Sequence, residues 1–113
     1  MKKLSHFDEQ GKIKMVDVSD KQITKRRAVA SGKVLMSSET LEVLKNQTNP
    51  KGNPFEIARI AGIMAAKQTP NLIPLCHQLP LAKVDVKTAL KDYGIYIEAE
   101  VITISNTGVE MEA

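Results

Sequence analysis

The chain has few aromatic side chains and almost no cysteine. Its 113 residues include no Trp, two Tyr, two Phe and one Cys. One cysteine allows no internal disulfide bond and is typical of a reducing compartment, so we expect a cytoplasmic location. Proteins that bind single-stranded nucleic acid stack bases on aromatic side chains along a basic groove. So few aromatic residues argue against nucleic acid as a partner.

Long apolar runs are also missing. No segment is apolar over enough residues to cross a membrane, and the N-terminus lacks the hydrophobic region of a signal peptide. Sixteen Lys and Arg against thirteen Asp and Glu give a net charge of +3, which mildly favours anionic partners such as phosphorylated small molecules. The length predicts one domain with an aliphatic core.

Residues 1–14 are polar and without periodicity, so we predict a flexible N-terminal arm followed by a single domain over residues 15–113. Between residues 27 and 36, alternating polarity predicts a half-buried strand with Ala28, Ala30, Val34 and Met36 on its apolar face. Ser38 is the expected N-cap of a short helix over residues 39–45, with Leu41 and Leu44 facing inward.

The clearest helix signal begins at Asn53, a good N-cap followed by Pro54 at the first helical position and Glu56 in capping-box register. Thr69 and Pro70 are expected to end this helix. Its apolar stripe, the face that normally packs on a core, consists of Ile57, Ile60, Ala61, Met64 and Ala65.

Two further alternating segments, residues 81–89 and 95–103, flank a turn at residues 91–94 and predict an antiparallel hairpin. The segment between the helix and the hairpin, Asn71–Pro80, holds the only cysteine, Cys76, and one of two histidines, His77. Pro74 and Pro80 bracket this pair and predict a stiff, extended connector. A connector of this kind is a common place for a functional site, although a buried structural Cys76 and a hydrogen-bonded structural His77 would give the same pattern.

Other titratable residues suggest where an anion could bind. Lys51 precedes a helix N-terminus, which favours a phosphate group, and Lys25–Arg27 forms a basic cluster that is equally typical of a solvated surface. Glu110 and Glu112 lie close to each other near residue 113. A metal site is not expected, because the cysteine, histidines and acidic residues show no metal-ligand spacing.

Five segments resemble the MoaC family, the molybdenum cofactor biosynthesis proteins C that act as cyclic pyranopterin monophosphate synthases. The resemblance covers almost the whole chain and is carried by Met15–Val18, Lys51–Gly52, Ala58–Lys67, Leu72–His77 and Thr107–Ala113. It implies an α+β, ferredoxin-like fold, with an antiparallel sheet and helices packed on one face. It further implies dimers that assemble into a hexamer, with the active site at a subunit interface.

The same resemblance implies an activity. The family converts 3′,8-cyclo-7,8-dihydro-GTP, supplied by a partner radical enzyme, into cyclic pyranopterin monophosphate with release of diphosphate. No metal or organic cofactor is implied. Lys51, His77 and Glu112 match positions expected to be catalytic, and the expected substrate contacts also include Leu75, Cys76, Glu110 and Met111. From electrostatics alone, Arg26, Arg59 and Lys67 are candidate contacts to the phosphates.

The chain departs from the family pattern at Asn53, Gln78 and Asn106, where aspartate, proline and lysine are usual. Family members also continue beyond the position of Ala113 into a helix that carries a catalytic aspartate and lysine. We therefore expect a lyase that lacks part of its machinery, with exposed apolar surface and an altered oligomeric state. The alternative is an inactive truncated paralogue that serves as a nucleotide-binding or assembly module.

Overall fold

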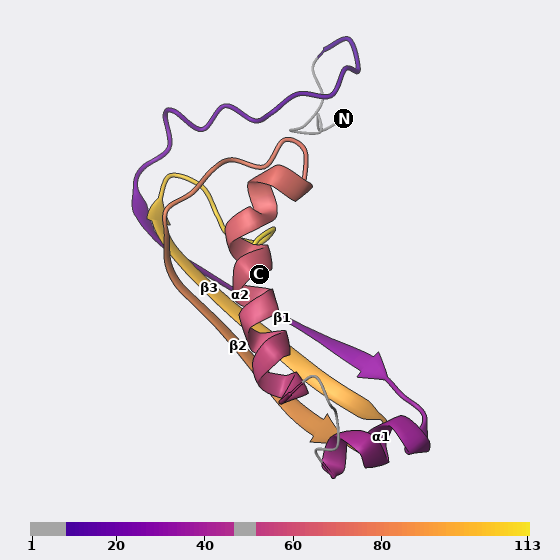
Figure 1. Ribbon diagram of the computed structural model, residues 1–113. Helices are drawn as coiled ribbons and strands as arrows, with labels where there is room; N and C mark the ends of the chain where they lie inside the picture. The colour runs from indigo at the N-terminus through magenta and orange to yellow at the C-terminus, as the bar shows by residue number, and fades with distance from the viewer. Residues whose placement is uncertain (1–8, 47–51) are drawn as a thin grey trace.

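Within residues 9–46 and 52–113, which the computed structural model describes, three strands form one antiparallel sheet (Figure 1). The elements follow the order β1 (Thr24–Leu35), α1 (Ser38–Lys45), α2 (Pro54–Leu72), β2 (Leu81–Lys91) and β3 (Gly94–Ser105). Strand β3 is central, with β1 on one edge and β2 on the other. The predicted α+β class is confirmed. The ferredoxin-like arrangement remains a prediction.

The antiparallel hairpin predicted from the alternating segments is confirmed by the pairing of β2 with β3. Lys91 pairs with Gly94 across a two-residue turn, and the register continues to Leu81 opposite Thr103. Gly94 has φ +145°, and its Cα lies so close to the carbonyl of Val34 that a Cβ atom would collide with it. Glycine at this position therefore lets β1 approach the start of β3.

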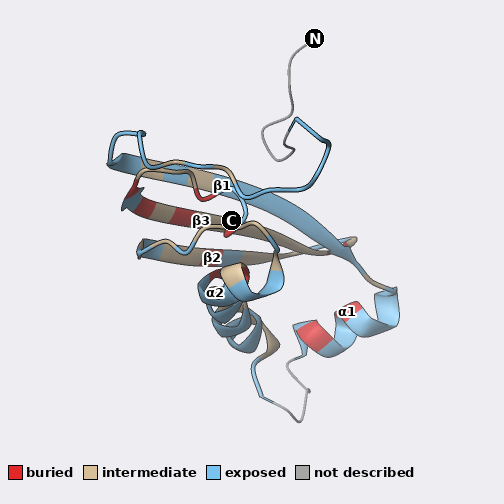
Figure 2. Ribbon diagram, turned by 90° about the horizontal axis from the view of Figure 1, so that it is seen from above, coloured by how far each residue is buried: buried red, intermediate tan, exposed pale blue. Residues whose placement is uncertain are grey.

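Helix α2 lies along one face of the sheet and packs on β2 (Figure 2). The predicted cap is confirmed, because Asn53 Oδ1 accepts hydrogen bonds from the amides of Phe55 at 3.0 Å and Glu56 at 3.4 Å. The helix continues through Pro70 to Leu72, so the predicted end at Thr69–Pro70 is wrong. A proline removes only one N–H group, and the last turn is still closed by the Ile73 amide, which donates to the Thr69 carbonyl at 2.9 Å.

The face of α2 that packs on the sheet carries small side chains. Ala66 and Thr69 are buried, and a Cβ atom at Gly62 would lie only 3.0 Å from Val86. The predicted stripe faces away, with Ile57, Ile60 and Met64 exposed by 50, 49 and 60 % and Ala61 and Ala65 also exposed. The expectation that this stripe packs on the core is therefore wrong for the single chain. Close approach of helix and sheet selects the smallest side chains instead.

Strand β1 is longer and more exposed than predicted. It begins at Thr24, and only Arg26 and Ala28 within it are partly covered. Ala30 and Val34, expected on a buried face, are exposed, as are Val29 and Leu35. The physical reason is that α2 packs on β2 at the other edge of the sheet. Within the described residues, no helix therefore packs over residues 29–35 of β1 (Figure 2).

Short helix α1 follows β1 at the far end of the sheet (Figure 1). Leu41 and Leu44 are buried as predicted. The N-cap is Ser37 rather than Ser38, and the Ser37 hydroxyl accepts a hydrogen bond from the Thr40 amide at 3.3 Å. The predicted arm, residues 1–14, lies partly outside the described residues.

Candidate active site

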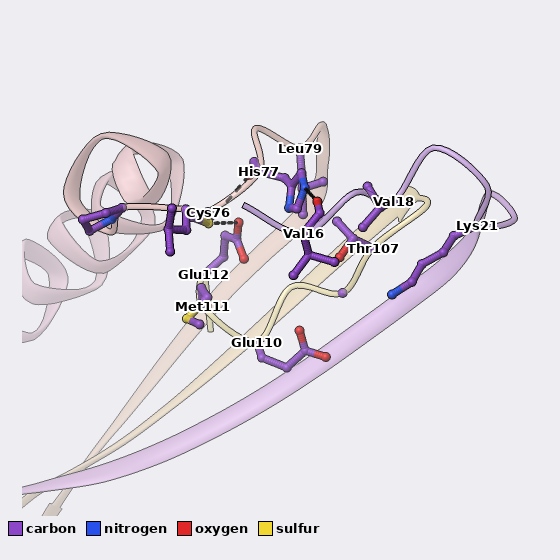
Figure 3. A pocket seen from close by; sticks show the side chains of 13 residues that line it. Val16, Val18, Lys21, Cys76, His77, Leu79, Thr107, Glu110, Met111 and Glu112 are labelled. Atoms are coloured by element: carbon purple, nitrogen blue, oxygen red, sulfur yellow. Dashed lines mark hydrogen bonds between the residues drawn. The ribbon is translucent and has the colours of Figure 1, made fainter. Parts of the chain in front are cut away.

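A cavity of about 430 Å³ opens beside the connector between α2 and β2 (Figure 3). Three segments that are far apart in the sequence form its walls: residues 16–21, residues 74–79 and residues 107–112. Side chains from all three point toward the same space. The lining residues are Val16, Val18, Lys21, Pro74, Leu75, Cys76, His77, Leu79, Thr107, Gly108, Glu110, Met111 and Glu112.

The connector enters the cavity through a tight turn. Ile73 is extended, as expected before a proline, with φ −112° and ψ 113°. Pro74 and Leu75 then form the turn, the Cys76 amide donates to the Ile73 carbonyl at 3.4 Å, and Leu75 has φ +69°. This is the pattern of a type II turn, in which the third residue requires a positive φ. The connector is thus not extended throughout, and a leucine occupies a conformation that favours glycine.

The orientation of His77 is fixed by residues 16–21, the N-terminal wall of the cavity. Its Nε2 atom lies 2.7 Å from the carbonyl oxygen of Val16. A carbonyl oxygen only accepts hydrogen bonds, so Nε2 carries a proton. In the neutral imidazole, Nδ1 is then the unprotonated nitrogen, and it is the atom that can accept or return a proton.

Cys76, from residues 74–79, and Glu112, from residues 107–112, meet where these two walls of the cavity join. Glu112 is buried, with 7 % of its surface exposed, and the Cys76 thiol donates to Glu112 Oε2 at 3.5 Å. Burial raises the pKa of the Cys76 thiol, and the charge of Glu112 and its hydrogen bond raise that pKa further. Cys76 is therefore a protonated hydrogen-bond donor at neutral pH and a poor nucleophile.

The third wall brings Glu110 and Met111 to the cavity. A Cβ atom at Gly108 would collide with the Glu110 carboxylate, so the glycine allows that side chain to fold over the backbone. One neighbouring hydrogen bond joins this wall to the N-terminal segment, and another stabilises its own turn. The Asn106 side chain donates to the Val18 carbonyl at 3.0 Å, and Ser105 Oγ donates to the Thr107 carbonyl at 2.9 Å.

Several residues expected at the site do not line this cavity. Arg26 hydrogen-bonds the carbonyls of Ser105 and Gln22, next to the cavity rather than in it. Arg59 pairs with Glu56 on α2, and Lys67 lies exposed on the same helix. Lys51 falls outside the described residues. Asn53, two residues further on, lies at the opposite end of α2 from the connector.

The N-terminal wall was missed as a site by sequence reasoning. Residues 15–21 lack periodicity, so Val16 and Val18 are indicated only by the resemblance of Met15–Val18 to a family motif. Lys21 supplies a cation to the cavity that no pattern had indicated. Within residues 9–46 and 52–113, no cluster of three or more His, Cys, Asp or Glu could hold a metal ion. None of the helices described there has the length and apolarity to span a membrane.

Comparison with known proteins gives consistent matches. The MoaC family model matches residues 15–113. The cyclic pyranopterin monophosphate synthase of Thermomicrobium roseum is 53 % identical over 115 residues, which cover 100 % of this chain and 69 % of the relative. The synthase of Streptomyces griseus is 51 % identical over 98 % of this chain and 63 % of its own length. A molybdenum cofactor biosynthesis bifunctional protein of Chlorobaculum tepidum is 52 % identical over 96 % of this chain, which spans 35 % of that protein.

The matched segments include all three walls of the cavity, since residues 16–21, 74–79 and 107–112 lie within residues 15–113. The chain spans between about a third and about 70 % of the length of these relatives. By family model and by identity over its whole length, the chain belongs to the MoaC family.

Proposed function

We propose that this chain acts as a cyclic pyranopterin monophosphate synthase in molybdenum cofactor biosynthesis. The reaction converts 3′,8-cyclo-7,8-dihydro-GTP to cyclic pyranopterin monophosphate and releases diphosphate. The observation that carries the proposal is the convergence of His77 and Glu112 on one cavity built from family motifs. Identity of about half over the whole chain to proteins named as this synthase supports it over the inactive-paralogue alternative.

The rearrangement moves protons, and the cavity offers two groups for that purpose. His77 can exchange a proton only at Nδ1, because Nε2–H is bonded to Val16. Glu112 is buried beneath the Cys76 thiol, which leaves its second oxygen as the position for a contact with substrate. Leu75, Cys76, Glu110 and Met111 would shape the walls around the reacting ring.

The substrate carries a triphosphate, which needs positive charge nearby. Among the described residues, Lys21 is the single Lys or Arg side chain that lines the cavity. Two carboxylates, Glu110 and Glu112, line the same cavity. Further cations must therefore approach from elsewhere. We propose that Lys51 serves the catalytic site, and that Arg26 and Lys67 bind phosphate, as expected from the sequence. The proposal requires no metal or organic cofactor.

The proposal extends to the surroundings of the enzyme. The substrate would come from a radical enzyme acting on GTP, and the single cysteine fits a cytoplasmic location. We further propose a homo-oligomer, dimers assembled into a hexamer, as the family resemblance implies. Exposed apolar surface on α2 and β1 supports assembly of this kind.

A single-turnover assay with the cyclic dihydro-GTP intermediate, read out as pterin after oxidation, tests the activity. The assay is run on this chain alone and on this chain extended by the C-terminal segment of the Thermomicrobium roseum relative. His77→Ala should lower the rate in whichever form is active by about 100-fold or more. Gln78→Ala is the matched control, because Gln78 is exposed and does not line the cavity. Absence of pterin from both forms would contradict the proposal.

A further inference from the structure

The N-terminal wall of the cavity is joined to two distant segments through its main chain. The Val16 carbonyl lies 2.7 Å from His77 Nε2, and the two residues face each other across the cavity rim (Figure 3). The Val18 carbonyl accepts a hydrogen bond from the Asn106 side-chain amide at 3.0 Å. Two residues of backbone span at most about 7 Å, so both bonds act on one short stretch of chain. A shift of the Val18 carbonyl therefore moves the Val16 carbonyl as well.

Asn106 extends from a part of the sheet that other contacts fix. It directly follows Ser105, the buried last residue of β3, which pairs with Thr24 of β1. The Ser105 hydroxyl donates to the Thr107 carbonyl at 2.9 Å and accepts from the Thr107 amide at 3.4 Å. The backbone on both sides of Asn106 is thus closed into a tight turn. Its side chain therefore ties the N-terminal wall to the end of the central strand.

The bond from Asn106 is not needed to satisfy the Val18 carbonyl. The same oxygen accepts a hydrogen bond from the Lys21 amide at 3.1 Å. Asp17 Oδ1 stabilises this turn by accepting from the Ser19 amide at 3.0 Å and the Ser19 hydroxyl at 2.7 Å. Loss of the Asn106 donor would leave the carbonyl with a partner, so the effect on folding should be small. It would instead release the turn, as one unit, from β3.

We propose that Asn106 is a positioning residue for His77: it holds the Val18 carbonyl and thereby keeps the Val16 carbonyl where it fixes the Nε2 proton of His77. The inference rests on the proposed function, in which His77 exchanges a proton with substrate at Nδ1. A ring whose Nε2–H has a fixed acceptor keeps the roles of its two nitrogens. When the acceptor moves, the ring turns more freely and presents Nδ1 to the substrate less often.

Four variants separate the donor from the rest of the side chain. Asn106→Asp keeps the size but sets a carboxylate oxygen against the Val18 carbonyl, which displaces the wall. Asn106→Ala removes the donor without adding charge, and decides the question if the aspartate variant does not fold. Asn106→Gln retains a carboxamide donor and should recover the original behaviour. Asn71→Asp is the matched control, since Asn71 is exposed on α2, bonds Gln68 at 2.7 Å and does not line the cavity.

Exchange of the His77 ring proton with water is the direct measurement. It is followed by NMR on ¹⁵N-labelled protein carrying His6→Gln, so that His77 is the only histidine. The bond to the Val16 carbonyl should slow exchange of the Nε2 proton. Asn106→Asp and Asn106→Ala should speed this exchange about tenfold, whereas Asn106→Gln and Asn71→Asp should leave it within about twofold. The urea midpoint of Asn106→Ala should shift by less than about 0.5 M, which separates positioning from general destabilisation.

A double-mutant cycle tests the consequence for catalysis. The single-turnover rate is measured at saturating cyclic dihydro-GTP intermediate, in whichever form of the chain is active. Asn106→Ala should lower this rate about tenfold when His77 is present and less than about twofold in a His77→Ala chain. The reason is that a positioning residue has no effect once the group that it positions is gone. Equal losses in both chains would overturn the proposal, because Asn106 would then act on the fold in general.

The exchange measurement uses no substrate, which keeps this inference separate from the proposed function. A His77 ring proton that exchanges equally fast with and without the Asn106 donor would overturn the positioning role. So would a ring proton that is not slowed in the unmodified chain. If no form of the chain makes pterin, the proposed function fails, while the exchange rates still decide whether Asn106 controls His77.

Discussion

The region around the cavity and the outer face of α2 invert the usual distribution of side chains. Beside the cavity, polar residues are buried: Thr103 is fully inaccessible, and Ser105 and Glu112 are each 7 % exposed. On the outer face of α2, large apolar residues are half exposed. The two regions therefore have different roles. Buried, hydrogen-bonded polar groups hold the cavity in one geometry, whereas exposed apolar groups are available to contact another surface.

Each buried polar group near the cavity has a hydrogen-bond partner. Thr103 Oγ1 donates to the Pro80 carbonyl at 2.6 Å, where the connector enters β2, and Glu112 accepts from Cys76. No buried side-chain nitrogen or oxygen in the described part of the chain lacks a partner. Loss of one hydrogen-bond partner near the cavity should lower the free energy of unfolding. Changes on the outer face of α2 should instead affect association more than folding.

The largest effect on folding is expected at the inner face of α2. Gly62→Val should destabilise the chain by about 3 kcal/mol, because even a Cβ atom lies 3.0 Å from Val86 and the two added methyl groups force α2 off β2. The free energy of unfolding in urea, measured on dilute protein, gives this value. Ala61→Val, one residue away on the exposed face, should change it by less than about 1 kcal/mol. Equal losses in both variants would contradict the contrast between the two faces.

A somewhat smaller effect is expected at Thr103. Thr103→Val keeps the shape of the side chain but leaves the Pro80 carbonyl without its donor, at a cost of about 1–2 kcal/mol in unfolding free energy. Thr88→Val makes the same chemical change at a half-exposed position of β2 and should stay within about 0.5 kcal/mol. If Thr103→Val is neutral, the hydrogen bond does not anchor the connector.

Thiol chemistry tests the electrostatics of the cavity without a substrate. Cys76 is the only cysteine, so any thiol reagent reports on it alone. Because burial and Glu112 raise the thiol pKa, its alkylation at neutral pH should be slower than in urea-unfolded protein. Glu112→Gln removes the negative charge, lowers that pKa and should speed the reaction. An unchanged rate in this variant would show that Glu112 does not act on Cys76.

The smallest effect on stability is expected on the sheet face away from α2, where charged side chains form ion pairs at the surface. Glu100 pairs with Lys83 at 2.7 Å and with Arg27, and these partners lower its pKa from 4.5 to about 2. The folded chain therefore binds fewer protons than the unfolded chain between these values. The stabilisation is complete above pH 4.5 and is lost as pH falls toward 2.

Glu100→Gln should accordingly flatten the decline of the urea midpoint between pH 5 and pH 2. Asp92→Asn, in the exposed hairpin turn, is a control that removes one carboxylate without breaking an ion pair seen in the described residues. Parallel pH profiles for wild type and Glu100→Gln would mean that the three charges do not act together.

Local signals in the sequence predicted the local structure well. The cap at Asn53, the hairpin around residues 91–94 and the inward positions of Leu41 and Leu44 depend on neighbouring residues and were confirmed. The orientation of α2 could not be obtained in this way. A helix with one face of glycine, alanine and threonine and another of isoleucine and methionine has two surfaces that can pack, and periodicity favours the larger one.

The cavity was predicted in part. Motif resemblance indicated residues 75–77 and 110–112, and the structure brings them to one space. The wall formed by Val16 and Val18, the left-handed Leu75 and the cation Lys21 depend on contacts between distant segments, for which residues 15–21 carry no periodic signal. Backbone carbonyls that serve as hydrogen-bond acceptors leave no trace in side-chain patterns.

Those carbonyls have a consequence for the effect of substitutions. The N-terminal wall is attached through main-chain oxygens of Val16 and Val18, which every amino acid possesses, whereas its side chains face the cavity. Attachment and shape are thus encoded at different positions: His77 and Asn106 hold the wall by its main chain, while the side chains of residues 16 and 18 set its contour. A substitution at either valine would change the fit to a ligand without removing the main-chain oxygen through which the segment is attached.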